Sequence, residues 1–167
     1  SVQARASESR DVAQVQRRHV TVMFCDLVGS TPLAESLDPE DLREVILSYQ
    51  QACARAVERY EGHTAKYLGD GIVVYFGYPR AHEDDAQRAV HAGLGILDEL
   101  AALNLRLGER LDAELHVRIG VHTGLVVAGE MGGGATREEL AIVGETPNIA
   151  ARLESSAAPD TLVISDA

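Results

Sequence analysis

Two short apolar runs joined by a glycine-rich step constrain the fold more than any other feature of this sequence. Residues 63–68 and 72–76 are both typical of strands, and Gly69-Asp70-Gly71 joins them. An Asp-Gly step between such runs is a strong hairpin signal, because both residue types tolerate the backbone angles of a tight turn. The sequence therefore predicts an antiparallel strand pair near the middle of the chain.

Strand and helix patterns follow one another along the rest of the sequence. The clearest helix starts after Asp38, with Pro39 in its first position, and ends near Gly62. Further strands are expected at 19–25, 115–122, 125–130, 140–143 and 161–164, and further helices after residue 31, at 83–105 and at 146–154. The 83–105 helix is expected to turn these residues inward: Ala86, Val90, Leu94, Leu97 and Ala101. This order predicts an α+β sandwich with helices packed on a mostly antiparallel sheet.

The length and charge of the chain restrict its partners. Its 167 residues suit one domain, which we place at 18–167 after a polar lead-in or linker at 1–17. The formal net charge of −11 opposes a non-specific grip on nucleic acid or an anionic membrane, so we expect contact with neither. A polyphosphate can still bind if metal ions supply positive charge.

The two cysteines and the N-terminus indicate a reducing compartment. Cys25 and Cys53 form no disulfide framework, and each lies in an apolar pattern, so we expect reduced core residues. The polar N-terminus has no signal-peptide pattern. We therefore expect a cytoplasmic domain, and the start at Ser1 rather than Met favours a longer parent protein.

Two aspartates are the first candidates for chemistry. Asp26 ends the expected 19–25 strand beside a glycine-containing turn, and Asp70 lies at the hairpin tip. Each has an ordinary alternative, because a turn Asp bonds its own backbone and Asp-Gly suits a hairpin anyway. If neighbouring strands bring the two carboxylates together, they suit Mg²⁺ or Mn²⁺ held jointly with substrate phosphates.

Three further polar residues lie where they can bind a nucleotide. Asn148 and Arg152 share one face of the expected 146–154 helix, and Arg suits phosphate oxygens. The alternative is a solvent-facing Asn with an Arg paired to Glu145 or Glu154. Lys66 lies in the strand before Asp70 and is either functional or a lysine that only extends its stem over apolar neighbours.

Several other patterns carry no function. The six histidines have no partners at zinc-ligand spacing, and the sequence contains no P-loop motif. The Gly132-Gly133-Gly134 run lacks the flanking strand and helix that a phosphate loop needs, so we expect a flexible loop.

Four ordered segments resemble the class III nucleotidyl cyclase catalytic domain, closest to bacterial multidomain and soluble-type adenylyl cyclases. These segments are Phe24–Thr31, Lys66–Gly71, Arg118–Gly124 and Val143–Leu153, and the resemblance spans about residues 18–166. It implies a ferredoxin-like or palm-like fold. It also implies a homodimer with two composite ATP sites, in which the aspartates of one subunit face the purine-binding residues of the other.

The resemblance also implies a role for each candidate. Asp26 and Asp70, with the backbone of Leu27, match the ligands of two divalent cations, Mg²⁺ or Mn²⁺. Asn148 matches the residue that positions the ribose, and Arg152 matches the residue that stabilises charge on the α-phosphate. The backbone N–H groups that match the phosphate-binding turn belong to Leu27, Val28, Gly29, Ser30 and Thr31.

Purine selection departs from the family pattern. Lys66 matches the purine-selecting lysine and favours ATP, because Lys only donates and adenine N1 accepts. Its usual partner is Asp or Thr, and Ala141 stands there instead. Thr136 or Glu139 could take the place of this missing partner of Lys66. If neither does, we expect the preference for ATP over GTP to be relaxed.

The expected function is an adenylyl cyclase that converts ATP to cyclic AMP and pyrophosphate. The alternative is a non-catalytic cyclase-homology module that dimerises or regulates. The sequence retains all four residues that match the metal ligands and the ribose and transition-state contacts of the family, which favours catalysis. These are Asp26, Asp70, Asn148 and Arg152. Ala141, and an end before the family's usual C-terminal hairpin, favour the module. A diguanylate cyclase would need a Gly-Gly-Asp/Glu-Glu-Phe hairpin, which this sequence lacks.

Overall fold

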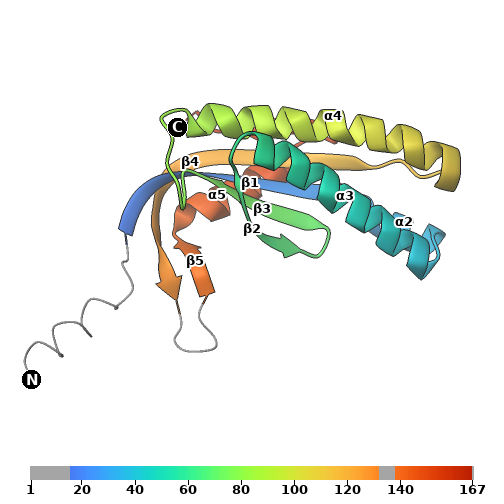
Figure 1. Cartoon of the computed structure of the whole chain (residues 1–167), viewed down its shortest axis with the longest axis horizontal. Coiled ribbons are helices and arrows are strands. Elements are labelled where there is room, and N and C mark those ends of the chain that lie inside the picture. The colour runs from blue at the N-terminus through green and yellow to red at the C-terminus, as the bar shows by residue number, and fades with distance from the viewer. Residues whose placement is uncertain (1–15, 132–137, 167) are drawn as a thin grey trace, which may run out of the picture.

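The computed structural model describes residues 16–131 and 138–166 (Figure 1). Its elements, in chain order, are β1 (Gln16–Val28), α2 (Ser30–Ser36), α3 (Pro39–Arg59), β2 (His63–Leu68), β3 (Gly71–Phe76), α4 (Asp85–Leu111), β4 (His116–Met131), β5 (Glu138–Val143), α5 (Glu145–Ser156) and β6 (Thr161–Ile164). The predicted α+β class is confirmed.

The strands form one six-stranded sheet with β1 at its centre. The order is β2-β3-β1-β4-β5, and β6 pairs with β4 at the point where β5 does not reach. The pairing of β4 with β6 is parallel, whereas the other four strand pairs are antiparallel. The predicted mostly antiparallel sheet is therefore confirmed, and its central strand carries the first candidate aspartate.

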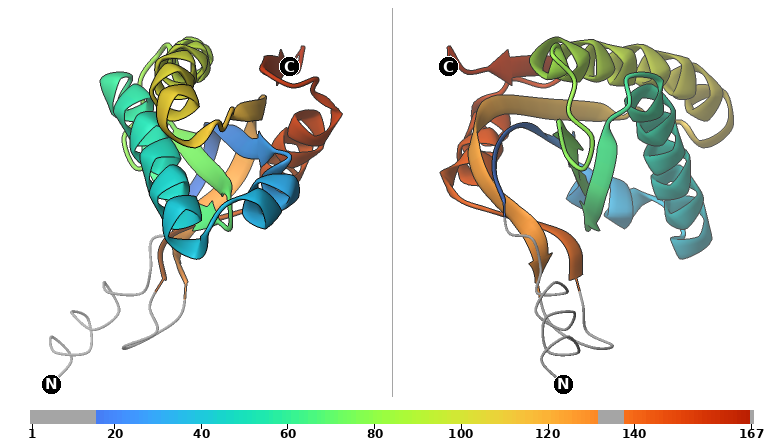
Figure 2. Two further views of the ribbon diagram at one scale, coloured as in Figure 1. Left: turned by 90° about the vertical axis from the view of Figure 1, so that its right-hand side faces the viewer. Right: turned by 60° about the vertical axis from the view of Figure 1, so that its left-hand side comes forward.

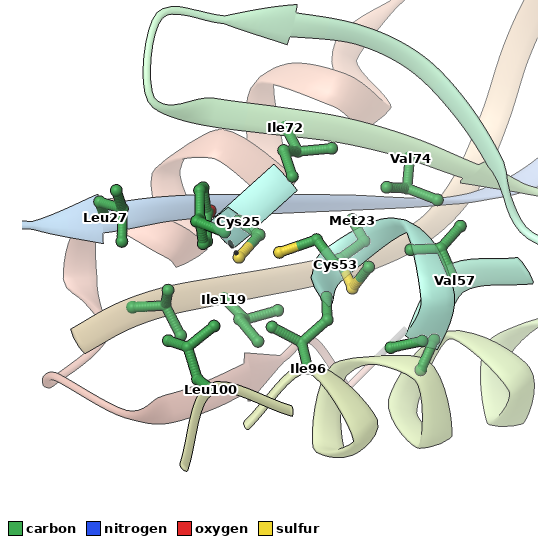
Figure 3. Packing of buried hydrophobic residues seen from close by; sticks show 14 of the residues in the cluster. Met23, Cys25, Leu27, Cys53, Val57, Ile72, Val74, Ile96, Leu100 and Ile119 are labelled. Atoms are coloured by element: carbon green, nitrogen blue, oxygen red, sulfur yellow. Dashed lines mark hydrogen bonds between the residues drawn. The ribbon is translucent and has the colours of Figure 1, made fainter. Parts of the chain in front are cut away.

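Helices cover both faces of this sheet, with α3 and α4 on one side and α5 on the other (Figure 2). Alternate side chains of β1 supply the two cores. Met23, Cys25 and Leu27 belong to the larger cluster under α3 and α4 (Figure 3). Val20 and Val22 belong to a smaller cluster that includes Ala150 of α5. Asp26 alternates with the first set, so it lies on the α5 face.

The two cysteines are buried in the larger core, as predicted. Cys25 and Cys53 are free and each is about 1% exposed. The Tyr49 hydroxyl lies 3.4 Å from Cys25 Sγ in a buried hydrogen bond. A hydrogen bond with Cys25, followed by burial, raises the pKa of the Cys53 thiol well above its usual value. Cys53 is thus a protonated thiol, and both cysteines pack in the core.

Helix α4 presents a different face from the one predicted. Leu94 is 48% exposed, and the buried stripe is instead made of Ala89, Ala92, Gly93, Ile96, Leu100, Leu103 and Leu107. A Cβ atom built on Gly93 would lie 2.2 Å from Leu162 Cδ1. The small residues let the helix approach the sheet closely, and the larger apolar residues that follow on the same face continue this contact into the core.

Two local predictions also differ from the structure. Residues 116–122 and 125–130 belong to the single strand β4, because both halves pair with the long strand β1. The β2–β3 turn places Gly69, with φ of 62°, at its first central position, and Asp70 has no positive φ. This is the pattern of a type II′ turn rather than the type I′ turn that Asp-Gly favours.

Candidate active site

Asp26 and Asp70 meet at one end of the sheet. Asp26 lies within β1, two residues before its end, and not after it as predicted. Gly71, directly after Asp70, pairs with Asp26 across the β1–β3 ladder. A Cβ atom on Gly71 would lie 3.4 Å from Asp26 Oδ1 and 3.2 Å from the Leu68 carbonyl oxygen. The absence of a side chain there lets the hairpin tip close over the Asp26 carboxylate.

The environment of Asp26 disfavours its negative charge. Burial is the main cause that raises its pKa to about 7, followed by a hydrogen bond with Asp70 and repulsion by Asp70 and Glu154. The Leu27 N–H donates a hydrogen bond that partly opposes this shift. Asp26 Oδ1 is buried and has no hydrogen-bond partner among the described residues. Such a carboxylate cluster favours a proton or a cation.

The donor set fits a cation that is shared with a ligand. Among residues 16–131 and 138–166, no group of three or more His, Cys, Asp or Glu side chains is arranged to hold a metal. Two carboxylates alone are too few for an all-protein metal cage. They suit Mg²⁺ or Mn²⁺, which in such sites completes its coordination with water and substrate phosphate oxygens.

Arg118 and Glu154 also belong to this cluster, although neither was predicted as a site residue. Arg118 is the β4 partner of Asp26, and its Nε is buried without a partner in the described part of the chain. Burial raises the pKa of Glu154, and the charge of Asp70 adds to this, whereas Arg118 and a hydrogen bond from Ser155 oppose it. A charged arginine within the otherwise apolar 115–121 run was the sequence signal that could have identified Arg118. That it pairs with Asp26, however, depends on the register between β1 and β4.

The turn after β1 presents its backbone beside Asp26. The Leu27 side chain is buried, so this residue can offer only its backbone to a ligand. Gly29 has φ of 70° and precedes the first residue of α2, Ser30. Thr31 is exposed. Neither Ser30 nor Thr31 caps the helix with its side chain, because Gly29 occupies the N-cap position.

The other candidate side chains lie on the outer surface. Asn148 and Arg152 are exposed on α5, and Arg152 lies 3.8 Å from Glu145. Lys66 is exposed on β2 opposite Val73. A single chain thus brings the two aspartates together and leaves Lys66, Asn148 and Arg152 facing solvent.

The purine-selecting position is only partly described. Ala141 lies in β5 opposite Gly129 of β4. The side chains of Ala141 and Glu139 lie outside the described part, as do all of Thr136 and Gly132–Gly134. In α5, Gly144 occupies the N-cap position, and the Thr146 hydroxyl donates a hydrogen bond to the Leu125 carbonyl oxygen at 2.9 Å.

Comparison with known proteins identifies the class of this domain. The family model described as the adenylate and guanylate cyclase catalytic domain matches residues 12–167. The chain therefore belongs to this family, which confirms the predicted resemblance. This family generally uses divalent metal ions.

Solved structures of both enzyme types resemble this one. The adenylyl cyclase CyaB from P. aeruginosa is 29% identical, with a TM-score of 0.87 over 92% of this chain and 79% of that chain. The guanylyl cyclase Cya2 is 33% identical, with a TM-score of 0.85 over 90% of this chain and 76% of that chain. These likenesses confirm the predicted palm-like fold and leave the preferred nucleotide open.

The curated relatives are much longer proteins. An adenylate cyclase from Anabaena cylindrica is 27% identical over 151 residues, which are 88% of this chain but 29% of that protein. The chain spans 14% and 21% of the length of two further relatives, both from Rhizobium meliloti. None of the described helices is both long and apolar enough to cross a membrane.

Proposed function

We propose that this domain is an adenylyl cyclase that converts ATP to cyclic AMP and pyrophosphate. The observation that carries the proposal is the meeting of Asp26 and Asp70 near the end of β1, where one buried carboxylate oxygen has no hydrogen-bond partner among the described residues. Family membership supplies the reaction class. The ribose 3′-oxygen would form a bond to the α-phosphorus, and the bond from that phosphorus to the β-phosphate oxygen would break.

Asp26, Asp70 and the Leu27 carbonyl would hold two divalent cations, Mg²⁺ or Mn²⁺. When bound, these cations would lower the pKa of the 3′-hydroxyl and neutralise charge on the phosphates. The backbone N–H groups of residues 27–31 would donate hydrogen bonds to phosphate oxygens. Arg118, whose Nε lacks a partner within the described residues, would supply a further donor to these oxygens.

The residues on the outer surface would complete the site of a second copy of the chain. Asn148 would orient the ribose, and Arg152 would stabilise the charge that develops on the α-phosphate. Their exposure, together with that of Lys66, supports a homodimer with two composite sites. A monomer would then be inactive.

Lys66 would favour ATP, because its ammonium group donates to adenine N1, whereas guanine presents a donor at N1. Ala141 offers no side-chain hydrogen bond, so we propose relaxed exclusion of GTP. The chain covers less than a third of the length of each of these relatives. This supports the proposal that the domain belongs to a longer parent protein with further domains. Because the proposed substrate is a nucleoside triphosphate, we also propose a cytoplasmic location.

The test is to incubate the chain with ATP or GTP and Mn²⁺ and to quantify cyclic AMP and cyclic GMP. Asp70→Ala should reduce product formation at least 100-fold, about the loss expected when a main source of transition-state stabilisation is removed. Asp98→Ala, at an exposed position on α4, is the matched control and should retain activity. Equal activity of wild type and Asp70→Ala would reject the metal assignment. If neither the wild-type chain nor a longer chain that extends past residue 167 forms a cyclic nucleotide, the result would favour the non-catalytic module.

A further inference from the structure

Helix α4 carries a second apolar stripe besides the one that it buries. Its residues follow one another at spacings of three or four, so they share one face of the helix. We call them the outer stripe: Ala86, Val90, Leu94, Leu97, Ala101 and Leu105. The stripe is about 30 Å long. Leu105 is 75% exposed, and only Val90 and Leu97 are half-buried. A continuous exposed apolar surface marks an interaction site, which single scattered leucines do not.

The outer stripe lies on the flank of α4 that faces away from α3. On the α3 side, the rings of Tyr60 and His91 stack, and Arg55 donates a hydrogen bond to Glu99 (Figure 2). With about 3.6 residues per turn, the outer stripe points away from these contacts. Its packing needs are therefore not met by the neighbouring helix.

Both ends of the outer stripe open into a cavity. A cavity of about 130 Å³ lies beside Ala86 and Val90, and Ile164 of β6 also lines it. A second cavity of about 320 Å³ lies beside Leu105 and Gly108. An apolar helix flank with a recess at each end suits a docked helix, whose large side chains can enter the recesses.

Gly108 continues the outer stripe and has no packing reason within the described residues. Gly93 of the same helix is needed, because a Cβ atom there would lie 2.2 Å from Leu162 Cδ1. A Cβ atom on Gly108 would meet no atom within 4 Å. Glycine inside a helix is less favourable than alanine, so a position without such a contact lacks an explanation in the free domain. The close approach of a second backbone supplies one.

The charges beside the outer stripe favour a basic partner. The C-terminal half of the stripe is bordered by exposed acidic residues: Glu109, Asp112 and Glu114. Two of these, Asp112 and Glu114, line the larger cavity. Arg110 does not neutralise them, because it is turned toward α3 and bonds Glu44.

A second copy of the chain does not fit these charges. If two α4 helices packed in parallel, Glu109 would face Glu109 of the other copy. If they packed antiparallel, it would face the acidic start of α4, near Glu83. Like charges oppose both arrangements, whereas a helix with a basic flank complements the border.

We propose that the outer stripe of α4 is a docking surface for an amphipathic helix of a partner protein, with an apolar face and a flank rich in lysine or arginine. Leucine-sized side chains of this helix fill the two cavities, and its backbone passes closest at Gly108. Its basic flank faces Glu109, Asp112 and Glu114. The proposal does not depend on cyclase activity, so either can fail without the other.

The test uses three synthetic helical peptides of about 20 residues, which match the length of the stripe. The first has leucines at the three- and four-residue spacing and lysines on the flanks. The second has glutamates in place of the lysines, and the third has the composition of the first with its leucines spread around the helix. Fluorescence anisotropy measures their binding to the chain. The first should bind, and the other two should bind at least tenfold more weakly. No binding of the first peptide up to about 1 mM would reject the proposal.

The variant Gly108→Gln separates docking from stability. Because its side chain enters open space, the melting temperature should not fall, whereas affinity for the first peptide should fall at least tenfold. Ala102→Gln, exposed on α4 outside the stripe, is the matched control and should leave the affinity unchanged. Leu105→Gln should also weaken binding, and Leu47→Gln, exposed on α3, should not. Wild-type affinity in Gly108→Gln or in Leu105→Gln would overturn the proposal.

Two other occupants would also overturn it. If analytical ultracentrifugation shows self-association of the chain that Leu105→Gln abolishes and Leu47→Gln does not, the stripe is an interface between two copies. If a chain that extends past residue 167 no longer binds the first peptide, the added segment covers the stripe. Peptide binding to both lengths of chain, with the dependence on Gly108 and Leu105, supports a partner helix.

Discussion

Asp26 stands opposite Arg118 on neighbouring strands, and within the described part of the chain each has a buried polar atom without a hydrogen-bond partner. The atoms are an acceptor, Asp26 Oδ1, and a donor, Arg118 Nε. An unsatisfied buried polar group costs about 1–3 kcal/mol, so a pair of them calls for an explanation. A metal-bound phosphate offers both a cation for the carboxylate and an anion for the guanidinium, which is why this relationship supports the proposed site.

The contact of α5 with β4 predicts opposite results for two glycines. Gly120→Ala should destabilise the domain by roughly 1–3 kcal/mol, because the new methyl group overlaps backbone atoms of Ala150 and Glu154. Gly108→Ala, in α4 with no atom within 4 Å, should stabilise it by about 0.5–1 kcal/mol. Urea unfolding measures both. A neutral Gly120→Ala would contradict the close approach of the helix.

The raised pKa of Asp26 predicts a pH dependence of the metal-free protein. In the folded state Asp26 keeps its proton up to a pKa of about 7, while in the unfolded chain it loses it near 3.8. The stabilisation that protonated Asp26 adds to the free energy of unfolding is therefore complete below about pH 4, and it is lost as the pH rises through about 7. After discounting for solvent exposure, the loss between pH 4 and 8 should be roughly 1–2 kcal/mol.

The variant Asp70→Asn tests the cause of that pH dependence. It removes a like charge, so the free energy of unfolding should fall less between pH 5.5 and 8 than in the wild type. Excess Mn²⁺ should likewise flatten the wild-type curve, because a cation replaces the proton. Thermal unfolding at several pH values measures this, and parallel curves for wild type and Asp70→Asn would contradict the assignment.

An ion pair fixes the start of β6 to β4. His116 Nδ1 lies 2.6 Å from Asp160 Oδ2, and the Val117 N–H donates to Asp160 Oδ1 at 3.2 Å. The hydrogen bond with Asp160 raises the pKa of His116. Its stabilisation is therefore complete below about pH 6.5 and is lost as the pH rises through the raised pKa.

Asp160→Asn should therefore destabilise the domain by about 0.5 kcal/mol more at pH 6 than at pH 8.5, a small value because the pair is partly exposed. The asparagine can still accept from Val117 at both pH values. Glu114→Gln, which alters a longer and more exposed contact of 3.6 Å to His116, should change little. Equal effects of Asp160→Asn at the two pH values would show that His116 is not charged in the pair.

Composite sites predict complementation between two inactive variants. Asp70→Ala damages one half of each site and Arg152→Ala damages the other half. After mixing and exchange of subunits, half of the dimers should be mixed, and each mixed dimer has one intact site. The mixture should recover about a quarter of wild-type cyclase activity. No recovery, with subunit exchange confirmed by mass spectrometry, would show that the site lies within one chain.

Some elements were predictable because their signals are local. The 39–59 helix follows from Asp38, Pro39 and a regular apolar stripe, and the hairpin follows from two apolar runs around a glycine turn. The buried face of α4 was not predictable from the stripe alone. Leu94 looked like a core residue, but Gly93 and Ala89 fit the sheet more closely, and only the packed structure distinguishes the two faces.

Residue types at fixed spacing were sufficient to predict the fold class, the candidate aspartates and the family. Which charges meet, in contrast, depends on the packing of distant segments. The register of β1 with β3 and β4 places Asp26 between Gly71 and Arg118, and the seating of α5 on Gly120 adds Glu154. Strand register and helix packing arise from contacts between distant segments, so no local pattern specifies them.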